Sequence, residues 1–114
     1  MTKKPVIMQI LPALQSGGVE RGAVDIAKAL KEDGFEPIVV SNGGVLTYQL
    51  KENEIKHIQL PVNSKNPFII YSNIEKIVKL IEEFKVDLIH VRSRAPMWSA
   101  YFAAKKTNTK IITT

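Results

Sequence analysis

The first thirty residues contain a continuous apolar run, followed by apolar residues at regular spacing. Residues 6–11 are apolar at almost every position, which predicts a buried strand. A loop with Gly17 and Gly18 follows. Apolar residues then recur at helical spacing and predict a helix with one buried face: Val19, Ala23, Ile26, Ala27 and Leu30. The chain therefore opens with a strand, a glycine loop and a helix.

The same alternation continues to the last residue. Short apolar or β-branched runs predict strands at 38–40, 56–60, 86–91 and 111–114. Helices are predicted at 45–53 and 70–84, the latter with an apolar stripe of Ile74, Ile77, Val78, Ile81 and Phe84. A last helix starts at Pro96, with its spacing marked by Trp98, Tyr101, Phe102 and Lys105 and with Trp98 expected in the core.

Strands that alternate with helices predict a doubly wound, Rossmann-like α/β fold of about five parallel strands, with helices on both faces and strand order 3-2-1-4-5. Ligands bind such sheets beyond the carboxyl ends of the strands, where the strand order reverses. The loops 15–20 and 90–95 should therefore face one crevice.

The first loop contains Gly17, Gly18, Glu20 and Arg21. Glycine lets the backbone approach a ligand closely, and the start of a helix presents free N–H groups to a phosphate. A tight turn that needs glycine explains the pair equally well. The pattern is not the full G-x-G-x-x-G fingerprint, and Ser41 ends the second strand where an acidic residue would bind a ribose, so NAD binding is disfavoured.

The second loop contains His90, Arg92, Ser93 and Arg94. Arginine matches carboxylates and phosphates bidentately, so this loop is a candidate anion site, with surface salt bridges as the alternative. His90 is more simply a packed or hydrogen-bonded residue than a catalyst, and His57 is expected to be structural. No catalytic triad and no metal-ligand spacing is present in the sequence.

Composition narrows the class of protein. The 114 residues suit one small domain, and the absence of cysteine excludes a disulfide framework and a thiolate metal site. The formal net charge of +5 fits a mixed-charge surface or attraction to phosphates, acidic sugars or an anionic membrane. Without a nucleic-acid motif, a signal peptide or a run of about 20 apolar residues, we expect a cytoplasmic protein that binds no nucleic acid.

Several stretches resemble a known family. Residues 10–21 are similar to the opening of retaining, nucleotide-sugar-dependent glycosyltransferases with two Rossmann-like domains, the GT-B fold of group 1. Residues 60–67 and 86–100 resemble a bacterial branch that assembles cell-surface polysaccharide or lipopolysaccharide, and the run Arg-Ser-Arg-Ala-Pro-Met-Trp-Ser at 92–99 is the most specific part. The resemblance spans essentially the whole chain.

The resemblance implies a division of labour between two domains. The N-terminal domain, to which residues 1–114 correspond, holds the acceptor, and a second domain holds most of the nucleotide-sugar donor. Gly17 and Gly18, with Glu20 and Arg21 beside them, match the loop near the donor diphosphate. His90, Arg92, Ser93 and Arg94 match the acceptor side. The acceptor is a glycan or glycolipid, the cytoplasmic face of the inner membrane is the implied location, and no metal or cofactor is implied.

The family's catalytic histidine follows the fifth strand in a Thr-x-His segment, and His90 is not its equivalent. The chain stops at Thr113-Thr114, so we expect no catalytic residue within it, a truncated domain, and no transferase activity from this piece alone. Two alternatives remain open from the residues. One is a non-catalytic anion-binding module that dimerises through an exposed sheet edge. The other is part of a nucleotide-sugar epimerase.

Overall fold

The computed structural model describes residues 4–14 and 17–113, without the side chain of Val19. Within these residues the elements follow one another in the order β1 (Val6–Ile10), α1 (Gly18–Glu32), β2 (Glu36–Ser41), α2 (Thr47–Glu52), β3 (Lys56–Gln59), α3 (Pro67–Phe84), β4 (Leu88–Val91), α4 (Met97–Thr107) and β5 (Lys110–Thr113). The strands form a five-stranded sheet of order β3-β2-β1-β4-β5, and all neighbours are parallel. The predicted fold class and strand order are confirmed.

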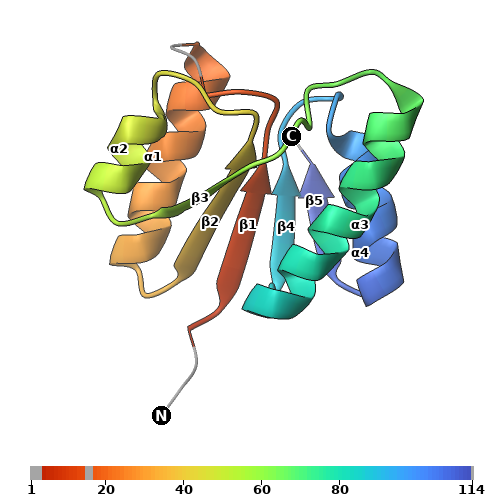
Figure 1. Ribbon diagram of the computed structural model, residues 1–114. Helices are drawn as coiled ribbons and strands as arrows, with labels where there is room; N and C mark the ends of the chain where they lie inside the picture. The colour runs from red at the N-terminus through yellow and green to blue at the C-terminus, as the bar shows by residue number, and fades with distance from the viewer. Residues whose placement is uncertain (1–3, 15–16, 114) are drawn as a thin grey trace.

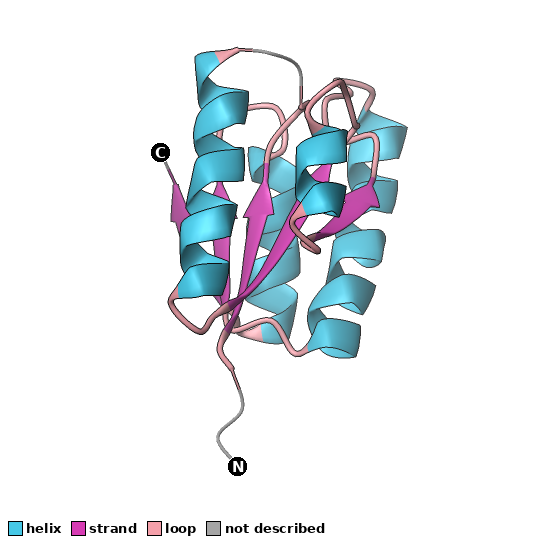
Figure 2. Cartoon of the chain, turned by 90° about the vertical axis from the view of Figure 1, so that its left-hand side faces the viewer, coloured by secondary structure: helices cyan, strands magenta, loops and turns pink. Residues whose placement is uncertain are grey.

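Helices cover both faces of the sheet. Figure 1 shows α1 and α2 on one side and α3 and α4 on the other, and Figure 2 views the sheet with α1 and α2 in front. The alternating side chains of β1 separate the two layers. Val6, Met8 and Ile10 pack toward α3 and α4, whereas Leu11 belongs to the core under α1 and α2. Each layer therefore has its own apolar core.

The core under α1 differs in one respect from the predicted face. Ala23, Val24 and Ala27 are buried, but Ile26 is 38% exposed, so its predicted place in the core was wrong. The small alanine side chains let the helix backbone lie close to the sheet, and this rotates Ile26 toward solvent. The predicted role of Val19 in this face falls on a side chain outside the described part.

The helix α4 corrects a second expectation. Trp98 is 61% exposed and does not belong to the core. The buried side of α4 consists instead of small residues, namely Ser99, Ala100, Ala103 and Ala104. Small side chains bring α4 close to the sheet and to α3, and the aromatic residues at the intervening positions then face outward. The prediction assigned the buried side of this helix from its largest apolar residues, but these lie on the exposed side.

The helix α3 carries the predicted stripe but begins earlier than residue 70. Ile74, Ile77 and Ile81 are buried. The side chain of Asn66 accepts a hydrogen bond from the Phe68 N–H at 2.9 Å, and Pro67 occupies the first turn, where its missing N–H costs nothing. An N-cap and a following proline thus add the first turn.

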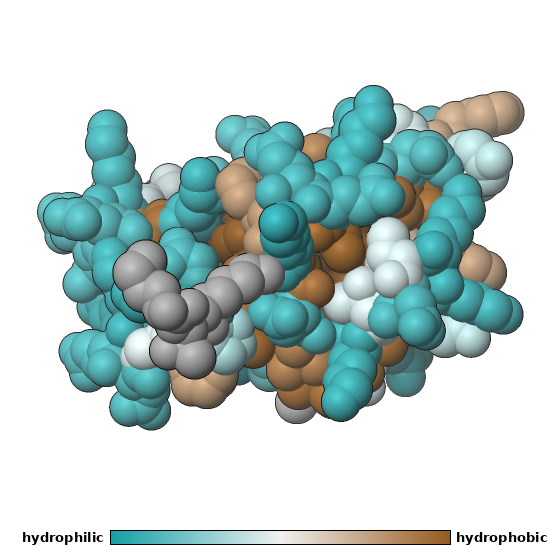
Figure 3. Space-filling view, turned by 90° about the horizontal axis from the view of Figure 1, so that it is seen from below, coloured by the Kyte–Doolittle hydropathy of each residue, from teal (hydrophilic) through white to brown (hydrophobic). Residues whose placement is uncertain are grey.

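The underside of the molecule carries a hollow at the amino ends of the strands. Its volume is about 740 Å³, and it lies between the last turns of α3 and α4 and the starts of β4 and β5. Figure 3, seen from below, shows hydrophilic side chains around apolar ones on this face. The hollow is at the end of the sheet opposite to the predicted crevice, so we do not assign the site to it.

Candidate functional site

The start of α1 is an open helix N-terminus. Gly17 is the N-cap residue with φ −73° and ψ 167°, and no side chain caps this end of the helix. Glycine is therefore not needed here for its torsion angles, unlike Gly34, Gly43 and Gly44, which have positive φ. A Cβ atom added at Gly18 would meet nothing within 4 Å. A strained turn at the N-cap therefore does not explain this glycine pair.

The carboxylate of Glu20 lies against this open end. A Cβ atom added at Gly17 would be 2.6 Å from Glu20 Oε2, so the side chain folds back over the N-cap residue. Glu20 stands three residues after the N-cap, the position at which an acidic side chain interacts favourably with the positive helix end. An anion that reaches the start of α1 therefore competes with the Glu20 carboxylate.

A buried glutamine connects α1 to the loop after β4. Gln9 on β1 is 0% exposed. Its Nε2 donates to the Ala23 carbonyl oxygen of α1 at 3.0 Å, and its Oε1 accepts from Arg92 Nε at 2.9 Å. A buried amide is costly unless it is hydrogen-bonded, and here both ends of the amide are. Gln9 therefore fixes where the Arg92 guanidinium lies.

The Arg92 guanidinium lies beside the second turn of α1. A Cβ atom added at Gly22 would be 3.9 Å from Arg92 Nη1. Among the described residues, Gln9 is the only side chain that hydrogen-bonds Arg92, so the two Nη groups keep their donors for a ligand. Partial burial lowers the pKa of Arg92, but an arginine stays cationic at neutral pH. The result is a positioned cation beside the second turn of α1, a helix whose N-terminus has no side-chain cap.

The rest of the loop after β4 has mixed character. His90 is the register partner of Gln9 and is half-buried, and burial followed by the neighbouring Arg92 charge lowers the pKa of His90. Ser93 has φ 87°, a left-handed conformation that costs energy outside glycine and is common at functional sites. Arg94 is exposed, as is Arg21 on α1.

Of the eight predicted site residues, Gly17, Gly18 and Glu20 are at the start of α1, and Arg92 lies beside the second turn of the same helix. His90 is on β4, Ser93 and Arg94 follow Arg92 in the chain, and Arg21 is on α1. Gln9 and Gly22 were missed by the sequence analysis. The signal for Gln9 was available, because it is the single polar residue in the apolar run at 6–11.

His57 has the structural role expected of it. Its Nε2 shares a hydrogen bond with Ser41 Oγ at 2.7 Å, and the same oxygen accepts from the Gly43 N–H at 3.0 Å. Burial lowers the pKa of His57. Ser41 is fully buried in this arrangement and does not point into the crevice as a ribose ligand would.

Two kinds of feature are absent from the described residues. None of their helices is long and apolar enough to cross a membrane. No group of three His, Cys, Asp or Glu side chains in this part of the chain is placed to hold a metal ion.

Comparisons with known proteins agree with the fold. The sequence model of Glycosyltransferase Family 4 matches residues 16–114. A glycosyltransferase from Rickettsia africae ESF-5 is 49% identical with a TM-score of 0.88, and the alignment covers 98% of this chain and 30% of that protein. None of the curated protein sequences matches.

More distant structures share the fold alone. MurG of Acinetobacter baumannii is 18% identical with a TM-score of 0.77, and the alignment covers 96% of this chain and 34% of MurG. A UDP-GlcNAc 2-epimerase from Neisseria meningitidis, bound to UDP-GlcNAc, is 17% identical with a TM-score of 0.64, with coverage of 95% and 31%. The chain spans about a third of the length of each of these proteins.

Proposed function

The chain belongs to Glycosyltransferase Family 4, and we propose that it is the acceptor-side domain of an enzyme that transfers a sugar from a nucleotide-sugar to a cell-envelope glycan or lipid. The observation that carries the proposal is the hydrogen bond from Arg92 to the buried Gln9, which holds a cation beside the second turn of α1. The 49% identity to the Rickettsia glycosyltransferase over 98% of this chain supports the reaction class.

The proposed chemistry is a substitution at the anomeric carbon of the sugar. The bond from that carbon to the nucleoside diphosphate breaks, the acceptor hydroxyl forms a new bond to it, and the hydroxyl proton is released. Negative charge collects on the departing diphosphate. Preorganised donors aimed at such charge are an effective form of catalysis. The N–H groups at the start of α1 and the Nη groups of Arg92 are the donors that this domain supplies.

Gln9 is a positioning residue in this proposal. Because its amide holds Arg92 Nε, the guanidinium keeps its orientation without a ligand, and less conformational entropy is lost on binding. Glu20 acts in the opposite direction, because its carboxylate shields the start of α1 until a stronger anion or an acceptor hydroxyl replaces it.

The proposal is tested by NMR titration of the ¹⁵N-labelled chain with inorganic pyrophosphate. We expect the largest shifts at the Gly17 and Gly18 amides and at the Arg92 Nε–Hε signal. In Gln9→Leu the Arg92 Nε–Hε signal should lose its hydrogen-bonded shift and pyrophosphate affinity should fall about fivefold. Gln9→Glu keeps the acceptor and should restore the signal. Shifts confined to the basic residues of the hollow near Lys110 would contradict the proposed site.

The transferase assignment needs a second experiment. Residues 1–114 replace the matching segment of the Rickettsia glycosyltransferase, and release of nucleoside diphosphate is measured with a panel of nucleotide-sugars and membrane extracts as acceptor. We expect turnover from the chimera and none from the 114-residue chain. A folded chimera that binds nucleotide-sugar and transfers nothing, while the parent Rickettsia protein is active, would contradict the assignment.

A further inference from the structure

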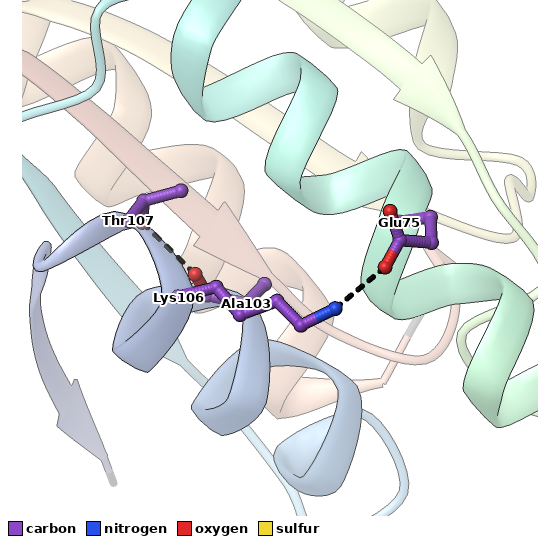
Figure 4. Close-up of polar contacts among 4 residues, drawn as sticks. All are labelled: Glu75, Ala103, Lys106 and Thr107. Atoms are coloured by element: carbon purple, nitrogen blue, oxygen red, sulfur yellow. Dashed lines mark hydrogen bonds and ion pairs between the residues drawn. The ribbon is translucent and has the colours of Figure 1, made fainter.

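Two polar side-chain contacts outside the proposed site differ in their exposure to water. Lys106 Nζ and Glu75 Oε1 are 2.7 Å apart between α4 and α3, as Figure 4 shows, and both side chains are about half exposed. Such a surface ion pair contributes little to stability. Ser41 Oγ and His57 Nε2 are also 2.7 Å apart, but Ser41 is fully buried and His57 is half-buried. A hydroxyl joined to an imidazole can pass on a proton, which an exposed ion pair does not do.

The Ser41 hydroxyl is also connected to a backbone amide, that of Gly43. The Gly43 N–H donates to Ser41 Oγ at 3.0 Å, so the hydroxyl oxygen is an acceptor here. Its own hydrogen is then available for His57 Nε2, with His57 in the Nδ1–H tautomer. The path from the Gly43 nitrogen through Ser41 Oγ to the His57 imidazole is called the proton relay below. Burial lowers the pKa of His57, and an imidazole that is neutral at pH 7 can accept a proton.

Residue 42 places a side-chain amide next to the nitrogen at which this relay starts. Asn42 is exposed, and its side chain has no hydrogen-bond partner among the described residues. A bond between Asn42 Cγ and the Gly43 nitrogen would close a succinimide ring. Glycine has no Cβ atom to shield its nitrogen, and Gly43 has φ 90°, a conformation that other residues rarely adopt. The exposed amide and the unshielded nitrogen are therefore neighbours in the chain and next to the relay.

We propose that Asn42 is a site of spontaneous modification, at which the Gly43 nitrogen attacks the Asn42 side chain while the proton relay takes up the amide proton. The attack forms a bond from the Gly43 nitrogen to Asn42 Cγ. The bond from Cγ to Nδ2 then breaks, and Nδ2 leaves as ammonia with the proton that the relay returns. Water opens the resulting succinimide at either carbonyl carbon and gives aspartate or isoaspartate.

The other exposed asparagines of the described residues lack this combination. The side chain of Asn53 is held, because its Nδ2 donates to a backbone carbonyl oxygen of α2 at 2.7 Å. Asn66 precedes a proline, which has no N–H to lose. Asn63 and Asn108 precede residues with a Cβ atom, whose N–H groups donate to backbone carbonyl oxygens and not to a hydroxyl. Asn42 is consequently the asparagine that we expect to react first.

The place of Asn42 gives the modification a consequence for pyrophosphate binding, and this part rests on the proposed function. The Asn42 N–H donates to the Pro12 carbonyl oxygen, and the Gly43 carbonyl oxygen accepts from the Leu14 N–H, both at 2.9 Å. Isoaspartate adds a carbon atom to the backbone between residues 42 and 43, so these two bonds no longer fit together. They hold the segment that leads from β1 toward Gly17, and the product also adds a carboxylate at the carboxyl end of β2. We therefore expect the isoaspartate form to bind pyrophosphate more weakly.

The experiment incubates the 114-residue chain at pH 7 and locates deamidated and isoaspartate-containing peptides by mass spectrometry. We expect Asn42 to react first and Asn63 much more slowly, so Asn63 is the internal comparison. Asn42→Gln should remove the fast reaction, because its longer side chain would have to close a larger ring. Reaction of Asn63 before Asn42 would overturn the proposal.

His57→Gln tests the relay separately from the Asn-Gly sequence. Glutamine can still hydrogen-bond the Ser41 hydroxyl but does not take up its proton, so Asn42 in the folded variant should react at least about tenfold more slowly. In denaturing urea the parent chain and the variant should react at equal rates, because the relay exists only in the folded chain. Ser41→Ala breaks the relay at its other member and should slow the reaction in the same way.

Circular dichroism checks that each variant is folded. Equal rates in the folded parent chain and the folded His57→Gln variant would overturn the relay, and so would the same slowing in urea. The reaction of Asn42 is measured without ligand, so its outcome is separate from that of the proposed function. Pyrophosphate titration of the isolated isoaspartate form should show a loss of affinity, and unchanged affinity would overturn the expected consequence.

Discussion

The two faces of the sheet are built differently, although the same strands supply both. Under α1 and α2 lies Gln9, a fully buried amide, which holds the charged side chain of Arg92 beside α1. Under α3 and α4 the buried polar residues, Asn73 and Ser99, donate to backbone carbonyl oxygens and hold no charged side chain. The unusual residues of this side are the aromatic ones exposed on its outer surface. A buried amide that holds a cation distinguishes the side of the proposed site, and exposed aromatic rings distinguish the opposite side.

The largest expected effect is a loss of stability that leaves pyrophosphate binding unchanged. Ile77→Ala removes a fully buried side chain from the apolar face and should lower the free energy of unfolding by about 3 kcal/mol. Urea denaturation measures this change. At a temperature where the variant is folded, pyrophosphate affinity should equal that of the parent chain. Reduced affinity in the folded variant would show that the two faces are coupled.

Arg92→Gln should have the opposite result, a loss of pyrophosphate binding with little change in stability. The substitution removes the cation that Gln9 positions, so pyrophosphate affinity should fall at least about tenfold with little change in the urea midpoint. Arg21→Gln is the matched control, since Arg21 is exposed on α1, and it should have a smaller effect. Equal losses in both variants would mean that net charge, not the positioned guanidinium, governs binding.

Glu20→Gln is on the same side of the sheet and should strengthen pyrophosphate binding. Neutralising the carboxylate that lies against Gly17 removes a competitor for the helix N-terminus. Isothermal titration with pyrophosphate should show about threefold tighter binding, the size of a helix-terminus charge effect. Weaker binding would indicate that Glu20 itself helps to hold the ligand.

The smallest effect is a pH dependence that comes from the two histidines. Burial lowers the folded-state pKa of His57 and His90, so the unfolded chain binds more protons. Their contribution to stability is present above the unfolded-state pKa of about 6.5 and is lost as pH falls through the lower folded-state pKa. Between pH 7 and pH 5 the free energy of unfolding should therefore decrease.

His57→Gln should reduce this slope and leave the pH 7 stability largely unchanged. Chemical denaturation at several pH values tests it. A variant whose slope equals that of the parent chain would assign the pH dependence to other groups.

Periodicity in the sequence was sufficient for the sheet, because strands and helices alternate with clear apolar patterns and parallel crossovers allow few strand orders. It was insufficient for α4. There the large aromatic residues suggested a buried stripe, whereas packing distance favours the small ones, so Trp98 was placed on the wrong side. Ile26 was misplaced for the same reason, since Ala23 and Ala27 set the contact of α1 with the sheet.

For the site, the loops at residues 15–20 and 90–95 followed from topology, since the carboxyl ends of adjacent parallel strands meet at one edge. The topology did not predict which arginine is hydrogen-bonded, or that Gln9 is its partner. The partner of Arg92 is 83 residues away on a neighbouring strand. Likewise the fold-back of Glu20 onto Gly17 depends on a rotamer that spacing alone does not specify.

The sequence by itself determined the order and type of the elements and the family resemblance, because these depend on local pattern and composition. Only the tertiary structure decided that Gln9 bridges Ala23 and Arg92, and that the aromatic rings of α4 lie on the outside of the molecule. Such contacts join residues far apart in the chain, and their geometry exists only once the sheet is assembled.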